Sequence, residues 1–235
     1  MKIPGVQWPT TIGEALSIQQ KLRKMIILED SPQVAEAELV TGVDVAFPSP
    51  GRGVCAAVTL DREGMVVEQV HAATTLKIPY IPGLLAFREG PPVLAALSKL
   101  RHEPDILMFD GQGFAHPRRV GIASHIGVLL GKPSIGVAKT VLCGKLEYKP
   151  KNLWETVPLV DRDELIGYAM RTSRKAKNPV YISPGHLVGF ETSVAIVKNM
   201  CQGYKLPEPT RRAHIIAETL KHKLKHGKED KTKGK

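Results

Sequence analysis

Cysteine is scarce in this chain of 235 residues, and its spacing argues against two kinds of site. The three cysteines, Cys55, Cys143 and Cys201, are odd in number and far apart, and none of them belongs to a C-x-x-C pair. Disulfide frameworks use even sets of cysteines, and cysteine zinc sites use closely spaced ones. We therefore expect neither a disulfide framework nor a zinc site built from cysteine.

Long apolar runs are also missing. No stretch reaches the length of about 20 residues that crosses a bilayer as a helix. Residues 1–5 lack the apolar segment of a signal peptide. These absences favour a cytoplasmic protein without a membrane partner. Apolar residues still make up 43% of the chain, which is enough to build a core and argues against global disorder.

Acidic side chains are outnumbered, because 33 Lys and Arg face 23 Asp and Glu and leave a formal net charge of +10. Half of this excess lies at the C-terminus, where residues 221–235 hold seven Lys against Glu229 and Asp230. A basic tail of this kind can simply keep a protein soluble, or it can contact the phosphates of a nucleic acid. Charge alone does not decide between these two interpretations.

The apolar residues recur with two periods, which predicts strands followed by alternating helices and strands. Alternation predicts strands over residues 38–47, 53–60 and 65–76, and the sequence D-R-E-G at residues 61–64 predicts a hairpin turn between the last two. The pair Pro91-Pro92 predicts the start of a helix that runs through Leu100. Helical stripes and short apolar runs predict further helices over 10–30, 120–130, 191–202 and 211–226, and further strands over 106–109, 134–138, 164–172 and 180–183.

This order of elements predicts an α/β fold. Three antiparallel strands followed by strand–helix–strand units give a mixed central sheet that is flanked by helices on both faces. We expect a single domain over residues 1–224 and a basic, disordered tail over residues 225–235, where the lysines gather.

Three acidic residues stand out, although each has an ordinary explanation when it is taken alone. Asp44 lies inside an apolar strand, where a buried ion pair or a turn would account for it. Asp110 follows the buried strand over residues 106–109 and precedes Gly111, as in an Asx turn. Glu89 lies near the expected helix start, where a carboxylate is favoured in any case.

The three carboxylates are more informative together. The predicted fold places them at one end of the sheet or on its first crossover helix, and ligands of open sheets bind at the carboxyl ends of the strands. Three acidic donors without a cysteine cluster or an H-E-x-x-H motif suit a hard cation such as Mg²⁺, for which Mn²⁺ is expected to substitute. In a basic protein this combination indicates phosphodiester hydrolysis.

Several segments closely resemble the endonuclease V family. The longest is the run P-Y-I-P-G-L-L-A-F-R-E at residues 79–89, which is too long to match by accident. The other segments are Val43–Phe47, Asp110–Arg119, Gly136–Thr140 and Ser183–His186. Together they extend the resemblance from about residue 12 to residue 220, nearly the whole chain.

The resemblance implies a ribonuclease-H-like fold and a Mg²⁺-dependent DNA repair endonuclease. Members of the family recognise deaminated bases, chiefly hypoxanthine, which inosine carries. They hydrolyse the second phosphodiester bond on the 3′ side of the lesion and leave 3′-hydroxyl and 5′-phosphate ends. Some members prefer RNA that contains inosine, so the sequence leaves the choice between DNA and RNA open. We expect a monomer.

The resemblance also assigns residues to the site. Asp44, Glu89 and Asp110 match the metal ligands of the family, and His214 matches a further catalytic residue of the metal site. Lys139 matches the lysine that lies beside the scissile phosphate. The family has a wedge that enters the duplex where the base leaves it. This wedge matches Pro79, Tyr80, Ile81 and Pro82, which we call the wedge segment. The base pocket matches Gly83, Leu85, Gly111, His116, Ile122 and Gly136.

Physical chemistry supports these assignments unequally. Two prolines stiffen the wedge segment, whose aromatic and β-branched side chains suit the gap left by an extruded base. The pocket residues offer mainly backbone groups, which can accept the N1–H and donate to the O6 of hypoxanthine and thereby reject adenine. By contrast, a lone histidine such as His214 is usually a surface or core residue, and a strand-end lysine such as Lys139 is usually solvated.

Three alternatives remain. Another ribonuclease-H-like nuclease, such as a junction resolvase, would not need the wedge segment. A binding module without catalysis would not need Asp44, Glu89 and Asp110 together. A cysteine hydrolase would use Cys143 with His116 or His186, but no flanking signature supports it.

Overall fold

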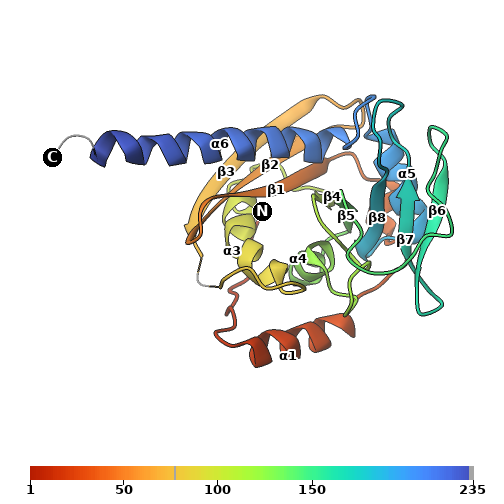
Figure 1. Cartoon of the computed structure of the whole chain (residues 1–235), viewed down its shortest axis with the longest axis horizontal. Helices are drawn as coiled ribbons and strands as arrows, with labels where there is room; N and C mark the ends of the chain where they lie inside the picture. The colour runs from red at the N-terminus through yellow and green to blue at the C-terminus, as the bar shows by residue number, and fades with distance from the viewer. Residues whose placement is uncertain (77, 233–235) are drawn as a thin grey trace.

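A mixed sheet of eight strands forms the centre of the protein, in the order β3-β2-β1-β4-β5-β8-β7-β6 (Figure 1). The computed structural model describes residues 1–76 and 78–232, with side chains up to residue 225. The neighbours β1, β4 and β5 run parallel, and the other pairs are antiparallel. The strands are β1 (Val40–Ser49), β2 (Arg52–Leu60), β3 (Val66–Thr75), β4 (Ile106–Phe109), β5 (Ser134–Ala138), β6 (Thr156–Asp161), β7 (Glu164–Met170) and β8 (Val180–His186).

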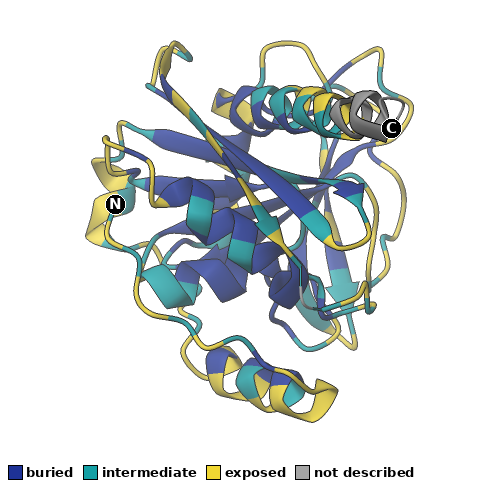
Figure 2. Cartoon of the chain, turned by 90° about the vertical axis from the view of Figure 1, so that its left-hand side faces the viewer, coloured by how far each residue is buried: buried dark blue, intermediate teal, exposed yellow. Residues whose placement is uncertain are grey.

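Helices cover both faces of this sheet, as the sequence predicts. The helices α3 (Leu85–Leu97) and α4 (Ile122–Leu130) pack on one face, and α5 (Phe190–Asn199) and α6 (Glu208–Thr232) pack on the other. The N-terminal helix α1 (Ile12–Arg23) lies outside α3 and α4 and is exposed on its outer side (Figure 2). A single turn, α2 (Pro32–Ala35), follows it.

The short strand β4 shows why the core is so apolar. Leu107 and Phe109 pack toward α3 and α4, while Ile106 and Met108 pack in the cluster on the α5 side. All four side chains are at most 1% exposed. Burial on both faces explains the unbroken apolar run from which this strand was predicted.

Two of the expected boundaries were wrong. Helix α3 begins at Leu85, so Pro91 and Pro92 lie inside it rather than at its start. The prolines lack the N–H groups that an uninterrupted helix would use, but the turn before them is held by packing. Phe87 is buried there, and Gly90 lies against Trp8 so closely that an added Cβ would sit 2.1 Å from the indole.

Helix α1 is shorter than the predicted 10–30 and begins after Thr11, which caps it by accepting a hydrogen bond from the N–H of Glu14.

The C-terminal helix differs from the expectation as well. Helix α6 runs to Thr232, beyond the expected end at residue 226, and so includes residues 225–232. Residues 233–235 lie outside the described residues. The division into a domain over residues 1–224 and a basic tail over residues 225–235 stays a prediction.

Candidate active site

Parallel pairing of β1 with β4 brings two of the predicted carboxylates together. Val43 of β1 lies opposite Phe109 of β4, so the next residues, Asp44 and Asp110, stand at the same level of the sheet. The backbone N–H of Asp110 continues the ladder by donating to the Val43 carbonyl at 3.1 Å. The structure therefore places both residues at the sheet end where the sequence predicted a ligand site.

Glu89 reaches the same place from α3. It is 8% exposed, and it lines a small cavity of about 10 Å³ together with Asp44 and Asp110. Burial raises the pKa of the Glu89 carboxyl well above its usual range, and the charges of Asp44 and Asp110 raise it further. The sequence suggested a helix N-terminus for Glu89, which was wrong, because it is the fifth residue of α3. A capping role at a helix N-terminus therefore does not explain why Glu89 is buried beside two other carboxylates.

His214 joins this cluster from α6. Its Nδ1 lies 2.8 Å from Oδ2 of Asp44 and 3.9 Å from Oδ2 of Asp110. The hydrogen bond with Asp44 raises the pKa of His214, although burial opposes this. The start of α6 can approach β1 closely because position 42 is glycine, where a Cβ would lie 2.0 Å from the backbone carbon of Pro209.

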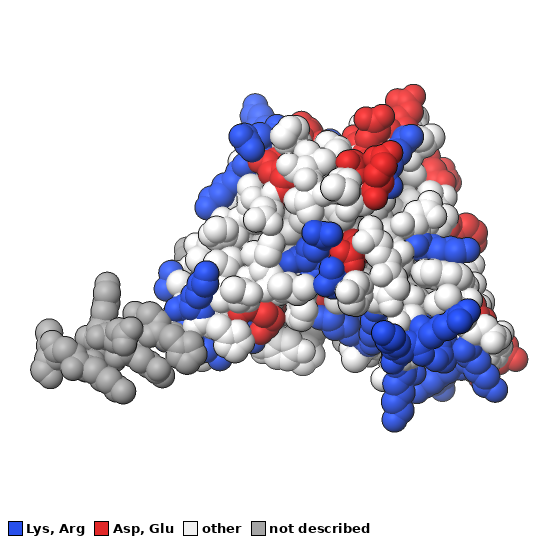
Figure 3. Space-filling model, turned by 90° about the horizontal axis from the view of Figure 1, so that it is seen from above, with Lys and Arg blue, Asp and Glu red and all other residues white. Residues whose placement is uncertain are grey.

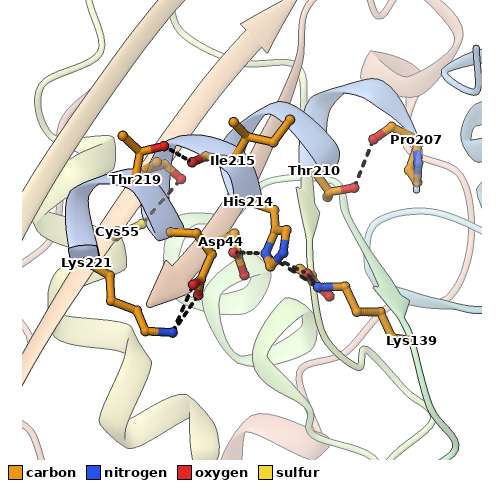
Figure 4. A network of polar contacts seen from close by, with 12 residues as sticks. Asp44, Cys55, Lys139, Pro207, Thr210, His214, Ile215, Thr219 and Lys221 are labelled. Atoms are coloured by element: carbon orange, nitrogen blue, oxygen red, sulfur yellow. Dashed lines mark hydrogen bonds and ion pairs between the residues drawn. The ribbon is translucent and has the colours of Figure 1, made fainter. Parts of the chain in front are cut away.

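Lys139 closes the cluster at the end of β5. Its ammonium forms an ion pair with Asp110 at 2.5 Å and lies 3.5 Å from Nδ1 of His214. Figure 4 shows the His214 ring between Asp44 and Lys139. A lysine pinned at a strand end holds a fixed positive charge beside the carboxylates, which a solvated lysine would not.

Lys205 is a cation near this site that sequence reasoning missed. Its Nζ lies 3.4 Å from the backbone oxygen of Lys139, just before α6. Partial burial lowers the pKa of Lys205, and the charge of Lys139 lowers it further. No sequence motif marks this lysine, because only the return of the chain from β8 through α5 brings it beside β5.

These residues fit a bound cation. Asp44, Asp110 and His214 each offer one ligand atom, and these atoms all lie within 4.8 Å of one another. Burial also raises the pKa of Asp110, and the Asp44 charge adds to this effect. Gathering carboxylates in a half-buried place is costly unless positive charge compensates them. A donor set of carboxylate oxygens and one imidazole therefore suits a metal ion, with Glu89 within reach of the same space.

The wedge segment, residues 79–82, lies on the surface between β3 and α3. The Tyr80 side chain is 65% exposed, and Ile81 is half-buried against the cluster formed by Leu84 and Phe87. Exposure of an aromatic ring on a loop with two prolines leaves it free to contact a partner. This placement agrees with the predicted wedge.

The predicted pocket residues form two groups of contacts among the described residues. Gly111 lies just after β4, Ile122 begins α4 and Gly136 is in the middle of β5. These residues lie together, and a Cβ on Gly111 would meet Ile122 at 2.8 Å. A Cβ on Gly136 would lie 2.6 Å from the backbone oxygen of Gly111. The second group is Gly83 with His116, whose Nε2 lies 3.1 Å from the Gly83 oxygen. Leu85 is half-buried at the first position of α3.

A cysteine nucleophile finds no support. Burial and the nearby Asp161 raise the pKa of Cys143, whereas a nucleophilic thiol needs a lowered one. The proposed base partners are also engaged, because His116 binds the Gly83 oxygen and Nδ1 of His186 accepts from the N–H of Ile27. The geometry thus disfavours the cysteine hydrolase.

The charge of the surface is uneven. Figure 3 views the face that carries α6, and Lys and Arg side chains gather there on the side away from the C-terminal end of that helix. A smaller group of opposite charges lies near the middle of this face. No helix among the described residues is long and apolar enough to cross a membrane. A concentrated basic surface suits a polyanion.

Sequence comparison with known proteins finds a family that matches most of this chain. A family model described as Endonuclease V matches residues 20–215. Endonuclease V of Kosmotoga olearia is 40% identical over 215 residues, which cover 91% of this chain and 94% of that protein.

Solved structures agree in fold. The crystal structure of endonuclease V from Streptomyces avermitilis has a TM-score of 0.85 and 40% identity, covering 94% of this chain and 97% of that one. Endonuclease V of Ciona intestinalis, crystallised with a 24mer DNA containing an inosine followed by a ribo-adenosine, has a TM-score of 0.79 and 28% identity. That match covers 91% of this chain and 98% of the other. These likenesses confirm the ribonuclease-H-like α/β fold that the resemblance predicts.

Proposed function

The chain belongs to the endonuclease V family, and from this premise we propose that it is a DNA repair endonuclease that cuts a strand beside a deaminated base, chiefly hypoxanthine. The observation that carries the proposal is the convergence of Asp44, Glu89 and Asp110 with His214 and Lys139 at one end of the sheet. The Ciona intestinalis relative, bound to DNA with an inosine, supports the choice of lesion.

We propose Mg²⁺ as the ion at this site, with Mn²⁺ as a substitute. Asp44, Glu89 and Asp110 would hold it, because carboxylate oxygens are the donors that these hard cations prefer. When bound, the ion supplies activation of water and stabilisation of the leaving oxygen. Within the chain, Lys139 offers a fixed positive charge to the scissile phosphate, and His214 can hold a proton on the nitrogen that faces Asp44.

Recognition of the base belongs to the wedge segment and the pocket in this proposal. The exposed Tyr80 ring fills the space that the extruded base leaves in the duplex. Backbone groups near Gly111 and Gly136 read the edge of hypoxanthine, whose N1–H and O6 reverse the polarity of adenine. The strand is hydrolysed at the second phosphodiester bond on the 3′ side, which leaves 3′-hydroxyl and 5′-phosphate ends.

Inosine-containing RNA is the second candidate substrate, because its base presents the same edge to the pocket. The relative's DNA carries a ribonucleotide directly after the inosine, which favours keeping RNA in the comparison. A junction resolvase is disfavoured by the exposed wedge segment. We place the enzyme in the cytoplasm and expect it to act as a monomer.

A cleavage assay tests the proposal. Single-stranded DNA, duplex DNA and RNA, each with one inosine, are incubated with the enzyme and Mg²⁺, and matched strands with adenosine serve as controls. We expect a single cut near inosine in at least one of the three and none in the controls. Equal cutting of the inosine and adenosine strands would contradict the proposed lesion specificity.

The variant Asp110→Asn tests the metal assignment in the same assay. It keeps the shape of the side chain and removes its charge, so cleavage should fall by about 100-fold or more while binding to inosine strands is retained. Asp163→Asn, in the exposed turn between β6 and β7, is the control for the same exchange elsewhere. Cleavage by Asp110→Asn at the wild-type rate would show that the metal assignment is wrong.

A further inference from the structure

The junction between the wedge segment and α3 is held by hydrogen bonds from distant parts of the chain. At this junction lies Gly83, whose carbonyl oxygen faces three side-chain nitrogens. These are Nε2 of Gln19 at 3.0 Å, Nε2 of His116 at 3.1 Å and Nη2 of Arg118 at 2.6 Å. A carbonyl oxygen ordinarily accepts one or two hydrogen bonds, so this one is unusually well anchored.

The hydrogen bonds also settle which nitrogen of His116 carries the proton. Its Nδ1 accepts from the backbone N–H of Arg118 at 3.1 Å. Nε2 therefore carries the hydrogen in the neutral ring and donates it to the Gly83 oxygen. Neutrality is expected, because burial and the nearby Arg118 lower the pKa of His116 to about 4.

Gln19 is the member of this group that belongs to another layer of the fold. It lies on the inner face of α1 and is 1% exposed. Its Nε2 also lies 3.3 Å from the Val120 oxygen, and its Oε1 accepts from Nε of Arg118 at 2.5 Å. Both ends of the amide are thus used, and one side chain orients Arg118 and binds Gly83 at the same time.

Gly83 cannot be exchanged easily at this point. Its φ of +77° is in the region that favours glycine, and a Cβ would lie 2.6 Å from Nη2 of Arg118. The turn therefore depends on the absence of a side chain and on the donors that surround its oxygen.

Packing holds the wedge segment on one side only, where Ile81 contacts the cluster formed by Leu84 and Phe87. A cavity of about 230 Å³ lies behind it, between the start of α1 and the residues Ile78, Pro79 and Ile81. A segment that borders an open cavity has lost contacts on that side. The hydrogen bonds at Gly83 therefore add a fixed anchor at the end of this segment.

We propose that Gln19 is a positioning residue for base extrusion, acting through Gly83 to hold the wedge segment in register with the base pocket. The proposal rests on the proposed function, because it takes the wedge and pocket roles from there. It adds α1 to the recognition machinery, although α1 itself contributes no metal ligand among the described residues.

The variant Gln19→Leu tests the proposal, since leucine can neither donate to Gly83 nor accept from Arg118. Single-turnover cleavage is measured for inosine in matched duplex and single-stranded oligonucleotides at saturating metal. We expect the duplex rate to fall by about tenfold and the single-strand rate to change little, because only the duplex requires a base to be unstacked. The ratio of the two rates is the readout, because a loss of folded enzyme lowers both rates equally.

Gln20→Leu is the matched control, because Gln20 is the exposed neighbour on the same helix and should keep the wild-type ratio. If Gln19→Leu does not fold, Gln19→Glu replaces it, since its carboxylate still accepts from Arg118 but has no hydrogen for Gly83. A wild-type ratio of rates in the folded variant would overturn the proposal. A wild-type enzyme that ignores inosine would instead overturn the proposed function, so the two failures are distinguishable.

Discussion

At the residue scale, His125 is a buried titratable group that the proposed reaction does not use. It lies on α4, is 1% exposed and stacks on Trp8 with ring centroids 6.0 Å apart. The Phe87 ring meets it edge-on at 4.8 Å. Its Nδ1 has no hydrogen-bond partner among the residues that the structure describes. Burial in this aromatic setting lowers the pKa of His125 to about 4.

This lowered pKa predicts a loss of stability in mild acid. The unfolded chain takes up the proton near pH 6.5, whereas the folded chain does so only near pH 4. The contribution of uncharged His125 to the unfolding free energy is therefore complete above pH 6.5 and is lost as the pH falls from 6.5 to 4. Between pH 7 and pH 4.5 the unfolding free energy should drop by roughly 2 to 3 kcal/mol from this residue.

The variant His125→Phe isolates the effect, because phenylalanine keeps an aromatic ring between Trp8 and Phe87 but does not titrate. Denaturant unfolding at pH 7 and pH 4.5 should show a smaller acid loss in the variant than in the wild type. His71→Phe, on the exposed side of β3, should show the wild-type loss. The same acid loss in wild type and His125→Phe would contradict the assignment.

At the element scale, the wedge segment is the part of the fold whose role is easiest to separate from the chemistry. Tyr80→Ala should slow cleavage of inosine in a duplex more than in a single strand, since stacking in the vacated space is worth about 1–3 kcal/mol. The metal concentration for half-maximal rate should stay the same, because Tyr80 is exposed and lies outside the carboxylate cluster. Single-turnover rates on both substrates measure this.

Two outcomes would contradict the wedge role. An equal loss on both substrates would mean that Tyr80 grips the strand in general. A lowered melting temperature together with that equal loss would mean that it supports the fold. Tyr148→Ala is the control, since Tyr148 is also exposed but lies beyond β5, away from the wedge segment.

The central elements could be predicted from the sequence because each buries a regular pattern. The run at residues 106–109 is apolar throughout and became β4, which is buried on both sides. The edge strand β6 was missed, because Pro158 interrupts its pattern. A proline is tolerated at an edge, where its missing N–H breaks no ladder on the open side.

The candidate site could be predicted in part. Asp44 and Asp110 follow from strand order, because the carboxyl ends of parallel strands meet. The nearness of His214 and Lys139 was known only through the family resemblance, since 75 residues separate them in sequence. Gln19 and Lys205 carry no local signal, and only the packing of α1 and the loop before α6 brings them to their partners.

At the scale of the whole molecule, the positive charge predicts a contribution to binding that ignores sequence. Deleting residues 225–235 removes five Lys, one Glu and one Asp, and should weaken binding to inosine strands and plain strands alike. Each lost phosphate contact should also reduce the slope of log affinity against log salt by about 0.9 on duplex DNA. Binding titrations at several salt concentrations measure this slope.

A chain of full length in which the five lysines are replaced by glutamine is the control for that deletion. It removes the charge and keeps the length, so it should reproduce the flatter slope. If both variants keep the wild-type slope, the C-terminal lysines take no part in binding.

The close approach of Gly42 to Pro209 has a consequence for synthesis. It seats the start of α6 on β1, so His214 meets Asp44 across 170 residues of sequence. A ribosome delivers β1, α3 and β4 long before α6, and a domain generally folds as a unit. A nascent or prematurely terminated chain that lacks α6 therefore cannot complete the cluster, because His214 is delivered last.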